Sequence, residues 1–339
     1  MKFAPYCVAL GVAALVALQQ PSIATRLAAE MDAARAGLTA NAPDDQRSSP
    51  LARLDRARKA LDAGRIYLAA YLTESPWEGA RNFTVVKAAA GVTTSDAFLE
   101  KWRSMGEPRP TSAPSGQALP AFVEALAAVA EARGPITYHA SRPYADDGGM
   151  FGGLYYLADS HSVMQFAAMV RALDWPSAGQ RPSFRSISGE INAFDMEMTS
   201  AYEKMEKANH PIYIQASAAL KQARTLNDRG QFAGALFEYL LSRYVFAPLR
   251  GAPASSPSTG RVTAVRAELS AGTDHSIAEM FLQLAEEQLG LGGDALRNAA
   301  SVVDDVIPAY RQAVAPATAA TVSQATAQVT ITLVRWPFT

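Results

Sequence analysis

The sequence predicts an all-α protein made of packed antiparallel helical hairpins, arranged as a solenoid-like or irregular bundle. Alanine is abundant, and apolar residues recur with the spacing of one helix face in many segments. Glycine and proline fall between these segments more than inside them, as expected for helices joined by short turns. These signals predict about ten helices.

Residues 1–24 have the pattern of a signal peptide. Lys2 precedes an apolar run at 7–18, and Ser22 and Ala24 fit a cleavage site. The run is shorter than the ~20 residues of a membrane-spanning helix. We therefore expect cleavage, no stable membrane span afterwards, and a periplasmic or secreted protein. The single cysteine lies in the removed segment, so we expect no disulfide.

Two segments rich in proline, glycine and serine, 104–118 and 249–260, are predicted linkers. They separate an N-terminal helical region (25–103), a central region (119–248) and a C-terminal region (261–314). The first helix of the central region is expected to begin near Pro120 and to end before Gly134-Pro135.

In the C-terminal region, Ser276-x-x-Glu279 has the pattern of a capping box, and Gly290 is expected to end that helix. Pro308 is expected to kink or split the following one. Residues 315–339 form an Ala/Thr-rich tail with a predicted terminal strand at 329–334. Such a strand needs a partner, within the chain or in another protein.

Two distant segments, 53–72 and 219–240, share one skeleton of small residues around a central glycine. The matching positions are Ala57, Gly64 and Ala69 in the first segment and Ala223, Gly230 and Ala235 in the second. The glycine supplies a left-handed turn, and the alanines let two antiparallel helices approach closely. The pattern predicts a tight helical hairpin at each place.

The downstream copy resembles a tetratricopeptide repeat. Gly230, Phe232, Ala235 and Tyr239 fall at the turn glycine and the following aromatic and small positions of that family, although Ala219 stands where the family has an aromatic. The resemblance covers about sixty residues, and the copies are too far apart for a tandem array. It implies binding of a protein or peptide in a groove. The groove residues would be Phe232, Phe237, Tyr239 and Tyr244.

A second candidate site is the stretch 136–161, which concentrates polar and aromatic residues around two glycine pairs. Its members are Tyr138, His139, Arg142, Asp146, Asp147, Tyr155, Asp159 and His161. Backbone N–H groups at the helix start could hold an anion, or the carboxylates could hold a hard cation. The stretch could equally be a glycine-rich connection with tyrosines packed beneath it. Asp159 and His161 are expected on different helix faces.

No standard catalytic or phosphate-binding motif is present, and no set of residues has the spacing of a known metal site. We therefore predict no metal, no cofactor and no catalytic residue. The net charge of −1 argues against nucleic acid as a partner. The sequence favours an exported protein that binds or scaffolds proteins or peptides in the cell envelope. The alternative is a helical enzyme or small-ligand binder that uses the 138–161 cluster.

Overall fold

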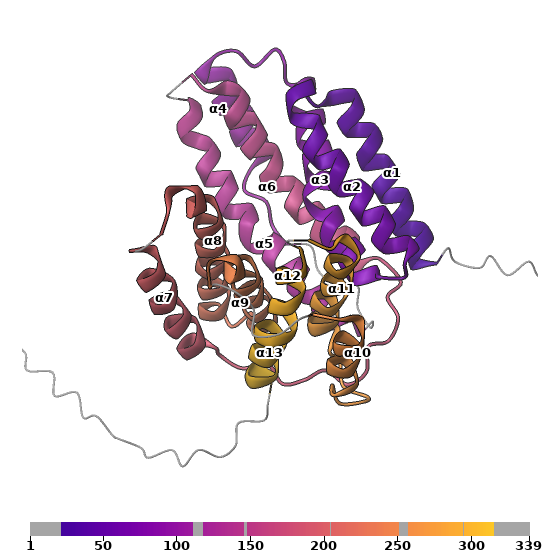
Figure 1. The fold of residues 1–339 in the computed structure, drawn as a ribbon. Coiled ribbons are helices and arrows are strands. Elements are labelled where there is room, and N and C mark those ends of the chain that lie inside the picture. Colours follow the sequence, from indigo (N-terminus) through magenta and orange to yellow (C-terminus); the bar gives the residue numbers. More distant parts are fainter. Residues whose placement is uncertain are drawn as a thin grey trace, which may run out of the picture.

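A computed structural model describes residues 22–110, 118–145, 148–203, 205–250, 257–293 and 295–314 (Figure 1). These residues form helices packed on one another, which confirms the all-α prediction. The predicted terminal strand, and most of the predicted signal peptide, lie outside the described residues. The pairing of extended backbone found within them is one isolated parallel bridge, between Gln180 and Thr273.

The α-helices follow one another without intervening strands. They are α1 (Ile23–Asn41), α2 (Asp44–Asp62), α3 (Ile66–Ala88), α4 (Ser95–Met105), α5 (Ala121–Ser141), α6 (Met150–Arg171), α7 (Ser188–Tyr202), α8 (His210–Asp228), α9 (Phe232–Phe246), α10 (Thr259–Ala267), α11 (Ser276–Leu291), α12 (Ala295–Ser301) and α13 (Ile307–Val314). None of these helices combines the length and the apolar character that crossing a membrane requires.

The helices pack in an order that differs from their order in the chain. Helices α1 and α2 pack on α3, α3 on α6, α6 on α5, and α5 on α9, which pairs with α8 (Figure 1). Helix α11 contacts both α3 and α5. One apolar core extends from Leu27 to Ala313 through all three predicted helical regions.

The two predicted hairpins are present as α2–α3 and α8–α9. Gly64 and Gly230 occupy the turns with φ angles of 75° and 73°, where residues with a Cβ are strained. The flanking alanines at both hairpins are completely buried between the helices: Ala57, Ala69, Ala223 and Ala235. Small residues thus allow the close helix pairing that the sequence predicts.

Helix α5 does not end at Gly134-Pro135 but continues to Ser141. The reason is a close approach of α5 to α6. A Cβ built on Gly134 would lie 2.4 Å from Cε of Met164 and 3.2 Å from the carbonyl oxygen of Ser160. This glycine therefore serves helix packing rather than a turn.

The capping box predicted for α11 is also wrong, because Ser276 is the first helical residue rather than the cap. The preceding Asp274 accepts a hydrogen bond of 2.9 Å from the Ser276 N–H instead. The helix passes Gly290 and ends at Leu291. The expected interruption near Pro308 is confirmed, since a π-helical turn at Val302–Val306 separates α12 from α13.

Candidate functional site

Part of the predicted 138–161 cluster faces α4 and the segment that follows it. The ring of Tyr138 stacks on Trp102 with 4.4 Å between ring centroids. His139 is exposed, 3.6 Å from Glu107. Nε2 of His161 lies 3.2 Å from the carbonyl oxygen of Gly106, and burial lowers the pKa of His161. These contacts fasten α4 to the bundle.

Another part of the cluster faces the bundle interior. Asp159 accepts a 2.9 Å hydrogen bond from Nδ2 of Asn82, and the ring of Tyr155 packs against Phe83 at 5.2 Å between centroids. Asp159 and His161 thus lie on different helix faces, as expected. Arg142 begins a short 3-10 helix after α5, and Asp146 and Asp147 lie outside the described residues. The described members of the cluster are divided between two environments rather than gathered in one cleft.

The predicted aromatic groove is not an open surface. Phe237 and Tyr239 are only 1 % and 4 % exposed, because the second helix of the hairpin is covered by α5 and α7. Tyr244 is half-buried beside Phe281. Phe232 does line a pocket of about 490 Å³, at the turn between α8 and α9.

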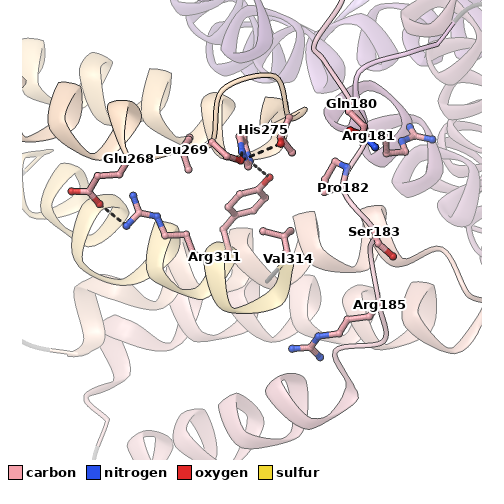
Figure 2. A pocket seen from close by; sticks show the side chains of 13 residues that line it. Gln180, Arg181, Pro182, Ser183, Arg185, Glu268, Leu269, His275, Arg311 and Val314 are labelled. Atoms are coloured by element: carbon pink, nitrogen blue, oxygen red, sulfur yellow. Dashed lines mark hydrogen bonds and ion pairs between the residues drawn. The ribbon is translucent and has the colours of Figure 1, made fainter. Parts of the chain in front are cut away.

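A larger pocket, of about 610 Å³, opens between three segments that are distant in sequence (Figure 2). They are the extended segment 180–185, the loop 268–275 before α11, and the end of α13. Its lining is rich in hydrogen-bond donors: Gln180, Arg181, Pro182, Ser183, Arg185, Glu268, Leu269, Ser270, Thr273, His275, Tyr310, Arg311 and Val314. This pocket is the strongest candidate for a functional site.

The extended wall is held to the loop by backbone hydrogen bonds. The N–H of Gln180 donates to the carbonyl oxygen of Gly272, and Gln180 accepts from the N–H of Asp274, both at 2.7 Å. The close approach depends on Gly179, where a Cβ would lie 2.6 Å from the carbonyl oxygen of Gly272. Gly179 also has a φ angle of 95°, which residues with a Cβ rarely adopt.

The loop is in turn anchored by the buried carboxylate of Asp274. Oδ1 accepts hydrogen bonds from the Ser276 N–H at 2.9 Å and the Ser276 hydroxyl at 2.6 Å, at the start of α11. Oδ2 accepts from the N–H of Ala121 at 2.6 Å, at the start of α5. One negative charge therefore caps two helix N-termini, whose free N–H groups favour an anion.

Three arginines contribute to the lining of the pocket, two on the extended segment and one on α13. The side chain of Arg181 extends to the side of the segment opposite Arg311 (Figure 2). Each has a carboxylate partner: Arg181 pairs with Glu124, Arg185 with Glu190, and Arg311 with Glu268. The arginine side chains are nonetheless 44 %, 39 % and 37 % exposed. Arg185 also donates to the carbonyl oxygens of Ser186 and Gln312, and Arg311 to that of Val265. A guanidinium has five N–H donors, so each arginine keeps donors for a ligand.

On the inner wall, Tyr310, His275, Ser270 and Thr273 form a chain of hydrogen bonds. The hydroxyl of the fully buried Tyr310 lies 2.9 Å from Nδ1 of His275. Nε2 of His275 lies 2.9 Å from the Ser270 hydroxyl, which donates to the hydroxyl of Thr273 at 3.1 Å. Burial lowers the pKa of His275, against the opposing effect of Asp274.

The direction of this chain decides what Ser270 can do. The one hydroxyl proton of Ser270 is donated to Thr273, so Ser270 accepts from Nε2 of His275, and Nδ1 accepts from the hydroxyl of Tyr310. The proton of the neutral imidazole is then on Nε2 and is donated to Ser270. In this tautomer Nε2 of His275 does not accept the proton of Ser270.

The pocket was not predicted from the sequence, because none of the segments that line it has a recognisable motif. One local signal was present in 181–185, where Arg181, Ser183 and Arg185 alternate with Pro182 and Phe184. Alternation of this kind is typical of an extended segment with one face inward. The wall formed by α13 has no such local signal.

No family model matches the chain, and no curated protein or solved structure is detectably similar to it.

Proposed function

We propose that this protein is an exported binding protein that holds an acidic peptide segment in the pocket formed by 180–185, 268–275 and α13. The observation that carries the proposal is that Arg181, Arg185 and Arg311 line one pocket and stay partly exposed beside their carboxylate partners. Arginine is well suited to carboxylate recognition because its donors are fixed in one plane.

The extended segment 180–185 favours a peptide ligand over a compact acid. Arg181, Ser183 and Arg185 are alternate residues of an extended segment, so the two arginines lie about 13 Å apart at ~3.3 Å per residue. Acidic side chains at alternate positions of an extended peptide have the same repeat. Such a peptide would place one carboxylate near each arginine.

The test is calorimetric titration with two capped five-residue peptides. One has glutamate at positions one, three and five with alanine between, and the other has glutamine in place of glutamate. We expect the glutamate peptide to bind, its affinity to fall as salt is raised, and the glutamine peptide to bind more weakly. Equal binding of both peptides, or binding of neither, would contradict the proposal.

Two variants locate the binding. Arg185→Gln is expected to lower the affinity for the glutamate peptide about threefold or more, the range for a partly exposed charge pair. Arg181→Gln is expected to lower it by a similar factor. The matched control is Arg35→Gln on α1, whose side chain is 42 % exposed and is paired with Asp55. If Arg35→Gln weakens binding as much as the pocket variants, the peptide is held by general charge attraction rather than in this pocket.

A further inference from the structure

A group of charged side chains is enclosed in the bundle where α3, α5, α6 and α9 come together. Glu74, Glu78 and Glu238 are 8 %, 2 % and 5 % exposed. Arg133 of α5 contacts Glu74 at 3.1 Å and Glu78 at 2.9 Å, and lies 3.6 Å from Asp159 of α6. One guanidinium thus faces several carboxyl groups, and an excess of buried negative charge is costly.

Two buried oxygen atoms in this group have no hydrogen-bond partner among the described residues. They are Oε1 of Glu78 and Oδ1 of Asn82. The two residues are one helical turn apart on α3, so their side chains lie on the same face. Both oxygens are acceptors if Glu78 is ionised. A proton on Oε1 of Glu78 would supply the missing donor, and it would remove the cost of leaving both atoms unsatisfied.

Charged and titratable groups on the surrounding helices contribute to the electrostatic environment of Glu78 and Glu238. Those that face Glu78 and Glu238 or their immediate neighbours are Arg53 on α2, Tyr71 and Glu74 on α3, Arg133 on α5, Tyr155 and Asp159 on α6. Of these, Arg53 and Arg133 are cations, and Arg53 is directed to the backbone carbonyls of Tyr71 and Leu72. Arg133 therefore remains the close cationic partner of the carboxyl groups.

Burial raises the pKa of Glu78 to about 8, against the opposing attraction of Arg133. Burial likewise raises the pKa of Glu238 to about 8, with a smaller contribution from Glu74, whose own pKa burial also raises. The side chain of Arg133 is 31 % exposed, although that of Glu78 is only 3 %. Solvent thus reaches the group at the arginine, which gives protons a route in and out.

We propose that this group is a proton-binding site, in which Glu78 is a neutral carboxylic acid at pH 7 and donates its proton to Oδ1 of Asn82. Alkaline pH transfers this proton to solvent and leaves an excess of carboxylate charge around Arg133. Repulsion between Glu74, Glu78 and Asp159 then weakens the packing of α3 against α5 and α6. The site makes the stability of the bundle dependent on external pH.

The direction of the pH dependence follows from the protons bound. An unfolded glutamate has a pKa of about 4.3, so between about pH 5 and 8 the folded protein holds more protons than the unfolded chain. Stability therefore falls as pH rises through this window and levels off above it. Each such glutamate changes the unfolding equilibrium constant by about tenfold per pH unit.

The experiment is urea unfolding of the full chain and of Glu78→Gln at pH 5, 7 and 9. Glutamine resembles the neutral acid, since it can donate to Asn82 and accept from Arg133. We expect the unfolding equilibrium constant of the variant to equal that of the parent chain at pH 5. At pH 9 the constant of the variant should be at least tenfold smaller than that of the parent chain. The control Glu100→Gln, at an exposed position on α4, should follow the parent chain at every pH.

If Glu78→Gln is destabilised by the same factor at all three pH values, Glu78 is an ionised partner of Arg133 and the proposal is wrong. A second measurement does not depend on folding of the variant. Infrared spectra of the parent chain at pH 7 should contain a protonated carboxyl band that disappears by pH 9. Its absence at pH 7 would also overturn the proposal.

Discussion

Gly179 determines whether the extended wall of the pocket can lie against the loop. Its φ angle of 95° disfavours any side chain, and a Cβ at this position would lie only 2.6 Å from the carbonyl oxygen of Gly272. The backbone bonds of Gln180 depend on this approach. A single hydrogen atom in place of a side chain thus fixes one side of the binding site.

We predict that Gly179→Ala lowers the free energy of unfolding by about 2 kcal/mol, from backbone strain and the contact with Gly272. The variant should also lower the affinity for the glutamate peptide, because Arg181 and Arg185 belong to the segment that begins directly after Gly179. Chemical denaturation and calorimetry measure the two effects. The control is Gly189→Ala on α7, where a Cβ meets no atom within 4 Å. Equal stability of Gly179→Ala and the parent chain would contradict the role assigned to Gly179.

Single residues were predictable where their role depends on near neighbours in the chain. The different faces of Asp159 and His161, and the turn positions of Gly64 and Gly230, follow from local spacing. Asp274 was not recognised, because its bond to Ala121 joins residues 153 positions apart. Local sequence offers no sign of such a contact.

At the scale of helices, the shared cap at Asp274 ties the start of α5 to the start of α11. Phe122 N–H also donates to the Ser276 hydroxyl at 2.9 Å, so the two helix ends are joined twice. The same loop continues into the pocket through Thr273 and His275. Helix placement and the shape of the candidate site therefore depend on one anchor.

Replacement of this anchor is expected to be costly. Asp274→Ala leaves N–H groups of two helices without their acceptor, and we predict a loss of about 3 kcal/mol in the free energy of unfolding. Asp274→Asn keeps one oxygen acceptor and should lose less. Asp55→Ala, which removes an exposed partner of Arg35, should change stability by less than about 1 kcal/mol. Urea denaturation of the three variants tests this order, and a cost for Asp274→Ala no larger than that for Asp55→Ala would refute it.

Helix existence was predicted better than helix ends. Gly134-Pro135 has the sequence of a helix terminus, yet α5 passes through it because the glycine admits Met164 and Ser160 of α6. The capping pattern at Ser276 matched locally, but the actual acceptor lies two residues earlier. Tertiary contacts decide between such alternatives, and they are absent from a local pattern.

For the molecule as a whole, one core unites the three helical regions that the predicted linkers separate. Leu27, Phe122 and Tyr310 belong to the same apolar cluster. The order in which helices pack, with α6 next to α3, was not predictable because it depends on which apolar faces fit together. The pocket could not be predicted for the same reason, since its walls come from segments brought together only by this packing.

We predict a single cooperative unfolding transition. Trp77 and Trp175 are 1 % and 6 % exposed within the common core, so their fluorescence should change together with the helical circular dichroism signal. Coincident transitions by the two probes in urea would agree with one cooperative unit. Two separate transitions would show that the regions divided by 104–118 or 249–260 unfold independently.

Because the walls of the pocket lie far apart along the chain, any molecule bound there connects segments that are distant in sequence. A molecule that bridges Arg185 and Arg311 must be released before the C-terminal helices can separate from the segment that precedes α7. Occupancy therefore raises the melting temperature by mass action. A library of compounds and peptides can be ranked by that rise alone, whatever molecule the protein meets in its own surroundings.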